Sequence, residues 1–175
     1  MNEKLTKELF EKFPELYAGH KLSPQENLMC FGFECGDGWH KIIYALSQAI
    51  NDNYKNELGN WEWDRDNFKR KYKIRNSWYE IKRHLKELFR YIFWNKNKII
   101  KYSKPSGVMA DQVKEKYGSL RYYTNHGNDY VYGLISMAEY MSYLTCEKCG
   151  TTKNVTQNKT GWISSLCPKC RKNKD

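Results

Sequence analysis

The chain has 175 residues, with 30 lysines and arginines against 20 aspartates and glutamates, and its formal net charge at pH 7 is +10. This length suits one ordinary domain with room for a small additional module. No uninterrupted apolar run is long enough to cross a bilayer, and the charged residues 1–13 lack the pattern of a secretory signal. We therefore expect an intracellular protein that does not associate with membranes.

The first residues of the chain show helical spacing of apolar side chains. Leu5, Leu9 and Phe13 fall on one side of a helix that Pro14 ends. We interpret this helix as one that packs on the main domain. Residues 14–36 contain glycines and a proline at intervals that indicate loops and short extended pieces.

The next segment combines residue types that could be either structural or functional. Asp37 stands immediately before an apolar face that runs from Trp39 to Ile50. We therefore predict a helix over residues 38–53, with the Asp37 carboxylate accepting free backbone N–H groups of its first turn.

Three functional interpretations of the same segment remain open. Cys30, Cys35 and His40 could join a second metal site, although their spacing is looser than that of zinc ligands. Cys35 and His40 could act as nucleophile and base. Glu34 and Asp37 could hold magnesium. We prefer the structural interpretation, in which these residues form a turn, a helix cap and buried thiols.

Residues 54–75 are polar and aromatic, and their pattern assigns them to no element. Beyond them, apolar residues between Trp78 and Ile92 step by three and four positions, which predicts a helix over 76–95.

Basic residues are concentrated between Arg65 and Lys104. This segment holds 14 basic residues against three acidic ones, a net charge of +11, so the remainder of the chain sums to −1. Lys82, Lys86 and Arg90 lie one helical turn apart and repel one another, which a phosphate-bearing or acidic partner would relieve. A solvated basic face is the alternative. The candidate partner-binding residues are Lys69, Arg70, Lys71, Lys73, Arg75, Lys82, Arg83, Lys86, Arg90, Lys96 and Lys98.

A hairpin and a helix are predicted after the basic segment. Residues 108–116 and 119–124 have the pattern of two strands, joined by a turn at Tyr117–Ser119. A helix over 129–144 then leads into a cysteine-rich end.

Four cysteines in this last part have the spacing of a zinc site. Cys146 and Cys149 form one Cys-x-x-Cys pair, Cys167 and Cys170 form another, and 17 residues separate the pairs. Zinc binds four thiolates tetrahedrally, and a site closed by four protein ligands has no open position for chemistry. We predict one structural Zn²⁺ ion, in preference to two disulfides or four free thiols.

The segment around these cysteines suits a small zinc-ribbon-like module. Residues 153–156 and 161–163 are predicted to form its two short strands. Trp162 is either a stacking platform for a base or part of the module's core, and in so small a unit we favour the core.

Three motifs together resemble those of a family of small phage- and prophage-encoded hypothetical proteins. They are Phe33–Trp39, Val113–Tyr122, and the four cysteines with Gly161–Trp162. The similarity covers residues 28–50 and 108–170 and leaves out the basic segment. The resemblance implies a mobile-element origin, and therefore the cytoplasm of a bacterial host cell, but no activity and no catalytic residues.

These patterns predict an α+β fold. An α+β domain over residues 1–144 carries a basic helical insertion at 51–105, and the zinc-ribbon-like module follows at 145–175. The favoured function is that of a non-enzymatic, zinc-stabilised protein that engages nucleic acid, RNA ahead of DNA, or a host nucleoprotein through its basic helix. With the phage resemblance, the expected role is inhibition of a host defence nuclease such as a CRISPR effector.

Two other functions remain open. The chain could be a metal-dependent nuclease that uses Glu34, Asp37 and His40. It could also be a transcriptional regulator, which would require a sequence-specific duplex target.

Overall fold

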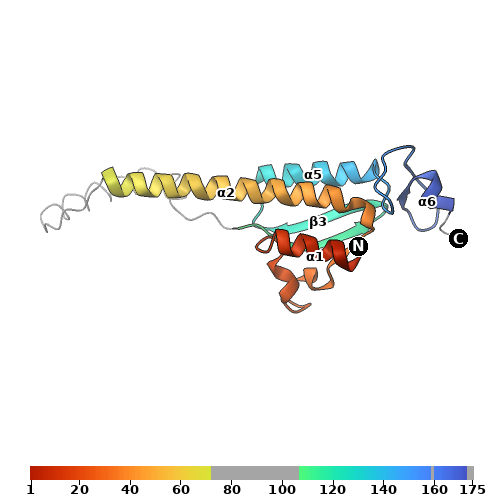
Figure 1. Cartoon of the computed structure of the whole chain (residues 1–175), viewed down its shortest axis with the longest axis horizontal. Coiled ribbons are helices and arrows are strands. Elements are labelled where there is room, and N and C mark those ends of the chain that lie inside the picture. The colour runs from red at the N-terminus through yellow and green to blue at the C-terminus, as the bar shows by residue number, and fades with distance from the viewer. Residues whose placement is uncertain (72–106, 159, 173–175) are drawn as a thin grey trace, which may run out of the picture. The chain divides into compact units, whose positions relative to one another are not determined.

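The computed structural model describes residues 1–71, 107–158 and 160–172. The chain forms two compact units, of which the first combines Met1–Asp52 with Gly107–Asp175 and the second is Asn53–Ser106. Helices and strands are both present, which confirms the predicted α+β class (Figure 1). No helix within the described residues is both long and apolar enough to span a membrane.

The first unit contains a three-stranded sheet in the order β1-β2-β3. β1 (Phe33–Glu34) runs parallel to β2 (Met109–Lys116), and β2 pairs antiparallel with β3 (Ser119–Asn125). The β2–β3 hairpin confirms the two predicted strands. Its turn places Tyr117 at φ 53° and Gly118 at φ 75°, and two successive positive φ angles are typical of the turns whose twist matches paired strands.

Two helices of this unit begin at asparagine caps. The Asn2 side chain accepts the N–H of Leu5 at the start of α1 (Glu3–Lys12). Asn128 does the same for Val131 in α5 (Asp129–Tyr143), and α5 packs on β3. In the view of Figure 1 the sheet runs between α1 and α5. Both helices confirm the predictions made from the sequence.

Helix α2 (His40–Lys71) is longer than the predicted 38–53 and crosses from the first unit into the second. Its continuation covers much of the stretch that the sequence pattern left unassigned. Tyr54, Leu58 and Trp61 recur along it at helical spacing, a signal that the sequence interpretation missed. A hydrogen bond between side chains four residues apart supports its start, where Asn53 donates to Glu57 at 3.2 Å.

The prediction that Asp37 caps this helix is wrong. A short 3-10 turn (Asp37–Trp39) precedes α2, its cap position is Gly36, and no side chain bonds to its free N–H groups. The Asp37 carboxylate instead accepts the backbone N–H of Asn2 at 2.6 Å and its side-chain amide at 2.7 Å. The backbone bond lowers the pKa of Asp37. Asp37 thus fastens the beginning of α1.

The strands near the cysteines lie later than predicted. β4 (Thr156–Gln157) and β5 (Ser165–Leu166) pair antiparallel, and α6 (Pro168–Lys172) follows. Asn154 has φ 52° and Gly161 has φ 72°. Positive φ angles are incompatible with extended strands. The predicted range 153–156 therefore overlaps β4 only at Thr156, and the predicted range 161–163 precedes β5.

A chain of hydroxyl groups crosses the core of the first unit. Tyr122 donates to the Tyr17 hydroxyl at 3.0 Å, which lies 2.6 Å from Ser47 Oγ. Ser47 in turn donates to the backbone carbonyl of Ile43 at 2.7 Å. Burial raises the pKa of both tyrosines, so both phenols stay neutral. The chain joins β3, the loop after α1, and α2.

Removing one hydroxyl from this chain should have an effect that depends on its place. In Tyr17→Phe the Tyr122 donor is buried without an acceptor, so we expect a loss of about 1–3 kcal/mol in the free energy of unfolding. In Tyr122→Phe no donor is stranded, and we expect about 0.5–1.5 kcal/mol. Urea unfolding of both variants measures the difference, and an equal or reversed order would contradict the proposed direction of donation.

Candidate metal centre

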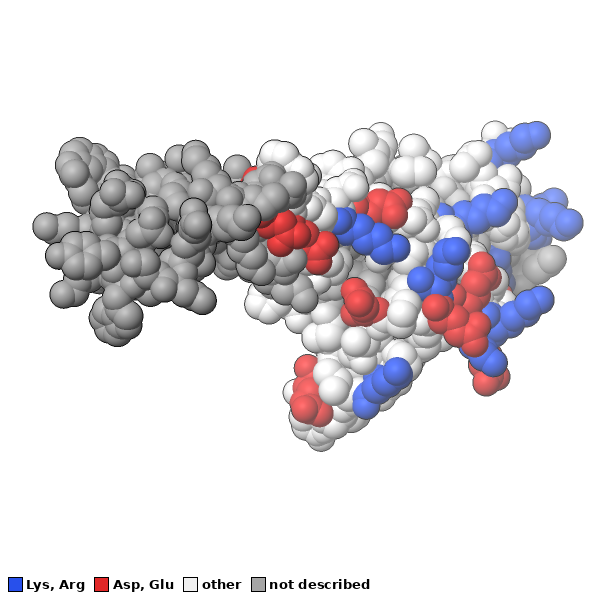
Figure 2. All heavy atoms as spheres, turned by 60° about the vertical axis from the view of Figure 1, so that its left-hand side comes forward, with Lys and Arg blue, Asp and Glu red and all other residues white. Residues whose placement is uncertain are grey.

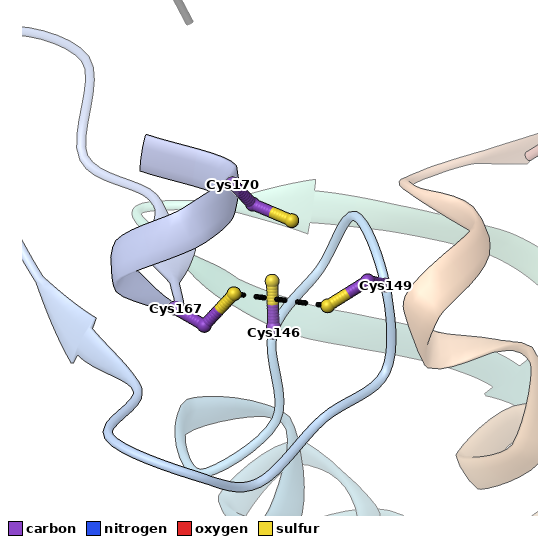
Figure 3. Close-up of side chains that lie close together, drawn as sticks. All are labelled: Cys146, Cys149, Cys167 and Cys170. Carbon is purple, nitrogen blue, oxygen red and sulfur yellow. Dashed lines mark hydrogen bonds between the residues drawn. The ribbon is translucent and has the colours of Figure 1, made fainter. Parts of the chain in front are cut away.

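The four predicted ligands lie together. The sulfur atoms of Cys146, Cys149, Cys167 and Cys170 all lie within 4.8 Å of one another. Figure 3 shows them converging from the turn after α5 and from α6. Cys149 and Cys167 have sulfurs 3.7 Å apart. Four sulfurs at ~2.3 Å from a tetrahedral ion would be separated by about 3.8 Å, whereas disulfide sulfurs are ~2 Å apart. The cluster therefore fits a metal ion.

A tight turn holds the first cysteine pair. The N–H of Gly150 donates to the Cys146 carbonyl at 2.8 Å, and the Cys146 N–H donates to the Thr151 carbonyl at 2.8 Å. Gly150 has φ 75°, a conformation that favours glycine. The turn brings Cys146 and Cys149 to the same side, where they face the second pair.

The second pair belongs to the start of α6. Pro168 is its first residue, a position where the missing N–H costs nothing. The Arg171 N–H donates to the Cys167 carbonyl at 3.0 Å and so closes the turn that carries Cys170. The backbone N–H of Cys170 also lowers the pKa of Cys167 to about 7. Burial raises the pKa of Cys170 to about 12, so without a metal ion only Cys167 of this pair favours the thiolate, which is the form that binds metals.

A segment far away in the sequence forms hydrogen bonds with the first cysteine turn. We call Gly36–Trp39 the GDGW segment. The Gly38 N–H donates to the Glu147 carbonyl at 2.7 Å, and the Trp39 indole donates to the Thr145 carbonyl at 3.0 Å. The Glu147 carboxylate accepts the Gly36 N–H at 3.0 Å. Three hydrogen bonds thus hold the backbone beside Cys146 against the start of α2.

The closeness of this contact explains both glycines. A Cβ atom at Gly38 would lie 2.1 Å from the Cys146 carbonyl oxygen, and one at Gly36 would lie 2.4 Å from the Glu147 carbonyl oxygen. Both neighbours are backbone atoms, which cannot rotate away. Any side chain at either position would therefore separate the GDGW segment from the cysteine turn.

The β2–β3 hairpin provides a second attachment. The carbonyl of Gly118 accepts the Ser165 hydroxyl at 2.5 Å and the Gln157 side-chain amide at 3.2 Å. The cysteine-containing segment is consequently fastened at two places within the first compact unit. The proposed division into domains at residues 144 and 145 stays a prediction.

The other candidate chemical residues engage separate partners. Glu34 accepts the Gln112 amide at 2.9 Å, and His40 Nε2 lies 3.5 Å from a Glu8 carboxylate oxygen. Burial raises the pKa of Cys35 to about 12, so its thiol stays protonated and a weak nucleophile. Within the described parts of the chain, the four-cysteine cluster is the one group of three or more such side chains close enough to share a metal ion. Neither Cys30, Cys35 and His40 nor Glu34, Asp37 and His40 form such a group.

The predicted partner-binding residues lie mostly outside the described residues. Lys69, Arg70 and Lys71 belong to the last turn of α2. The remainder, with the helix predicted over 76–95, fall between residues 72 and 106. Their role in binding stays a prediction.

Trp162 is not part of the module's core, contrary to our interpretation of the sequence. Its side chain is 75% exposed, whereas Leu166 and Cys167 are buried. Asn158 shapes the loop beneath it by donating to the Thr160 and Trp162 carbonyls, each at 2.7 Å. Gly161 lies beside it with φ 72°. A glycine at this position was a signal for a turn that the sequence offered.

No protein-family model, curated protein or solved structure matches the chain.

Loss of one thiolate should unfold the cysteine-containing segment. Because metal-binding energy is folding energy in such sites, Cys149→Ser or treatment with a strong chelator should lower the melting temperature by roughly 10 °C or more. Cys30→Ser, which removes a thiol outside the cluster, is the matched control and should change it little. Unchanged melting of Cys149→Ser would contradict a structural metal site.

A methyl group at Gly38 should damage the metal site from a distance. Gly38→Ala forces the backbone contact with Cys146 apart, so we expect several kcal/mol of destabilisation and a reduced metal content. Gly59→Ala is the control, since a Cβ atom there meets nothing within 4 Å and should stabilise α2 by about 0.5–1 kcal/mol. Calorimetry and metal analysis of both proteins test the coupling, which equal stability of the two variants would disprove.

Proposed function

We propose that this protein is a non-enzymatic binding protein, stabilised by one zinc ion, that engages nucleic acid through its basic segment. The observation that carries the proposal is the net charge of +11 between Arg65 and Lys104, against +10 for the whole chain. Segregation of this kind is the electrostatic footprint of a phosphate-binding surface.

Zinc is the metal that suits the donor set best. Four thiolates at tetrahedral spacing are typical of structural zinc sites, which are closed by their own ligands. Cys146, Cys149, Cys167 and Cys170 supply all four positions. With no position left for water or substrate, the ion would stabilise the fold and take no part in a reaction.

One face of the described residues carries charges of both signs. On the face shown in Figure 2, Lys and Arg side chains of the described residues alternate with Asp and Glu side chains. A surface of this kind attracts a polyanion weakly, because neighbouring charges of opposite sign cancel at distances beyond about 8–10 Å. The contrast supports the basic segment as the main site of phosphate binding.

Trp162 offers a second kind of contact. An indole that is 75% exposed, on a loop braced by Asn158, can stack on an unpaired base, and such stacking contributes about 1–3 kcal/mol per base. Unpaired bases are commonest in RNA loops and single strands. We therefore propose single-stranded RNA ahead of duplex DNA as the ligand.

In a cell, the protein would encounter this RNA as part of a host nucleoprotein. If the protein comes from a phage, as the resemblance of its motifs implies, occupation of the guide RNA of a defence nuclease such as a CRISPR effector would inhibit that enzyme. This role rests on the resemblance and on the charge of the basic segment.

Reversing charges in the basic segment should weaken RNA binding. Each phosphate that the protein neutralises releases counterion, so log affinity should fall with log salt at a slope of about −0.7 per contact for single strands. Changing Lys82, Lys86 and Arg90 to Glu should flatten this slope by about two and weaken binding at least tenfold at low salt. Fluorescence anisotropy with a labelled single-stranded RNA, read over a salt series, measures both.

The matched control changes Lys4, Lys7 and Lys12 to Glu, three basic residues in or near α1, and should leave binding almost unchanged. Equal affinity of the two triple variants would mean that the basic segment is a solvated surface. The same RNA incubated with magnesium should remain intact, and cleavage that disappears in Asp37→Ala would favour the nuclease instead.

A further inference from the structure

Helix α5 has one buried face and one exposed face. Its inner face buries Val131, Ile135, Ala138 and Ser142, and the helix packs on β3. Four residues at this spacing form one side of a helix, so the opposite side is left facing solvent.

Beyond its first turn, the outer side of α5 carries no charge. The residues aligned along it, which we call the outer α5 stripe, are Tyr130, Gly133, Met137, Tyr140, Met141 and Leu144. All of them are exposed, although 29% of the chain is charged. The two charged residues of α5 are Asp129 and Glu139. Asp129 is exposed in the first turn, four residues before Gly133, and Glu139 accepts the Tyr122 N–H at 3.1 Å on the side of β3.

The stripe is too large to be a scatter of single apolar residues. Tyr130 is 56% exposed, Met137 59% and Tyr140 60%. With side chains of 150–250 Å² for aromatic residues, its five larger members leave on the order of 500 Å² uncovered. The largest apolar patch on a typical monomer is about 300–600 Å², and patches of this size are often interfaces.

Most of the stripe is complementary to itself; the exception is Tyr140, which would meet the half-buried Leu134. If two copies of α5 cross antiparallel about Met137, position 130 meets position 144 and position 133 meets position 141. Tyr130 then faces Leu144 of the other copy, and Gly133 faces Met141. A Cβ atom at Gly133 would meet nothing within 4 Å, so this position leaves room for the methionine.

Net charge limits where two copies of the chain could meet. Two chains of net charge +10 repel each other, and an approach through basic surfaces would be costly. The outer α5 stripe is an uncharged surface through which the copies can meet. Two such stripes bury about 1,000 Å² in total, close to the lower limit of specific interfaces.

We propose that two copies of this chain form a symmetric dimer through the outer α5 stripe, with the two-fold axis next to Met137. In such an interface each residue meets its mirror position, and the residue on the axis meets itself. From its area we expect a weak dimer with a dissociation constant on the order of 1–100 µM.

A charge exchange at the axis tests this geometry. Met137→Lys and Met137→Glu each place like charges against each other, so each variant alone should be monomeric at concentrations where the unchanged protein is a dimer. An equimolar mixture of the two variants should recover a heterodimer. Sedimentation velocity of the nuclease-treated full chain in 0.5 M salt measures all three, at a salt concentration that removes bridging by nucleic acid.

Two further variants show whether the dimer depends on this stripe or on exposed apolar side chains in general. Phe31→Lys changes an equally exposed side chain, 61% accessible, in the 3-10 turn Leu28–Phe31, and should leave the dimer intact. Gly133→Gln should raise the melting temperature of the monomer, because glycine is a poor helix former, yet weaken the dimer at least tenfold.

The proposal is overturned if the unchanged protein sediments as a monomer at 200 µM. It is equally overturned if both Met137 variants remain dimeric, or if their mixture stays monomeric. Binding of the stripe to lipid vesicles or to another protein, with no self-association, would likewise replace it.

Discussion

The structure depends on a backbone contact between two segments that are far apart in the sequence. The Gly38 N–H and the Trp39 indole bind carbonyls on either side of Cys146, while Trp39 itself is fully buried in the core of the first unit. One short segment therefore starts α2, fills the core and supports the cysteine turn. The same residues therefore support the metal site and pack in the α+β core.

A metal ion in this position would reinforce more than its own ligands. Cys146 is bonded through its neighbours to the GDGW segment, and Ser165 in β5 is bonded to the hairpin turn at Gly118. The ion would thus cross-link the end of the chain to both the start of α2 and the β2–β3 hairpin. This arrangement would couple the stability of the metal site to that of the α+β core.

Features with local physical causes could be predicted from the sequence. The Cys-x-x-Cys spacing specifies a ligand set, and Tyr117–Gly118 between two strand-like stretches predicts a hairpin. Features that depend on distant partners could not. Asp37 has the sequence context of a helix cap, yet its carboxylate binds Asn2, 35 positions earlier, and nothing in either stretch announces the other. The roles of Gly36 and Gly38 likewise depend on a carbonyl more than one hundred residues away.

Two wrong or missing predictions have different origins. A tryptophan in a small module usually fills its core, but here Leu166 and the cysteines fill it, which leaves Trp162 outside. That outcome depends on how much space the neighbouring side chains leave, which composition does not reveal. The long continuation of α2 does carry a helical signal, because Tyr54, Leu58 and Trp61 recur at spacings of four and three, so the sequence could have predicted it.

The pairing of β1 with β2 has a consequence for how the chain reaches this structure. Phe33 pairs with Val113, and Trp39 bonds to Thr145, 106 positions later. Contacts of such long sequence separation form slowly, because the entropy of closing the loop between them is lost before the contact stabilises the chain. During synthesis the first 52 residues would emerge with their core partners still missing, and the last cysteine ligand comes only at position 170. The nascent chain must therefore keep Leu9, Phe13 and Trp39 from other apolar surfaces until nearly all of it has been made.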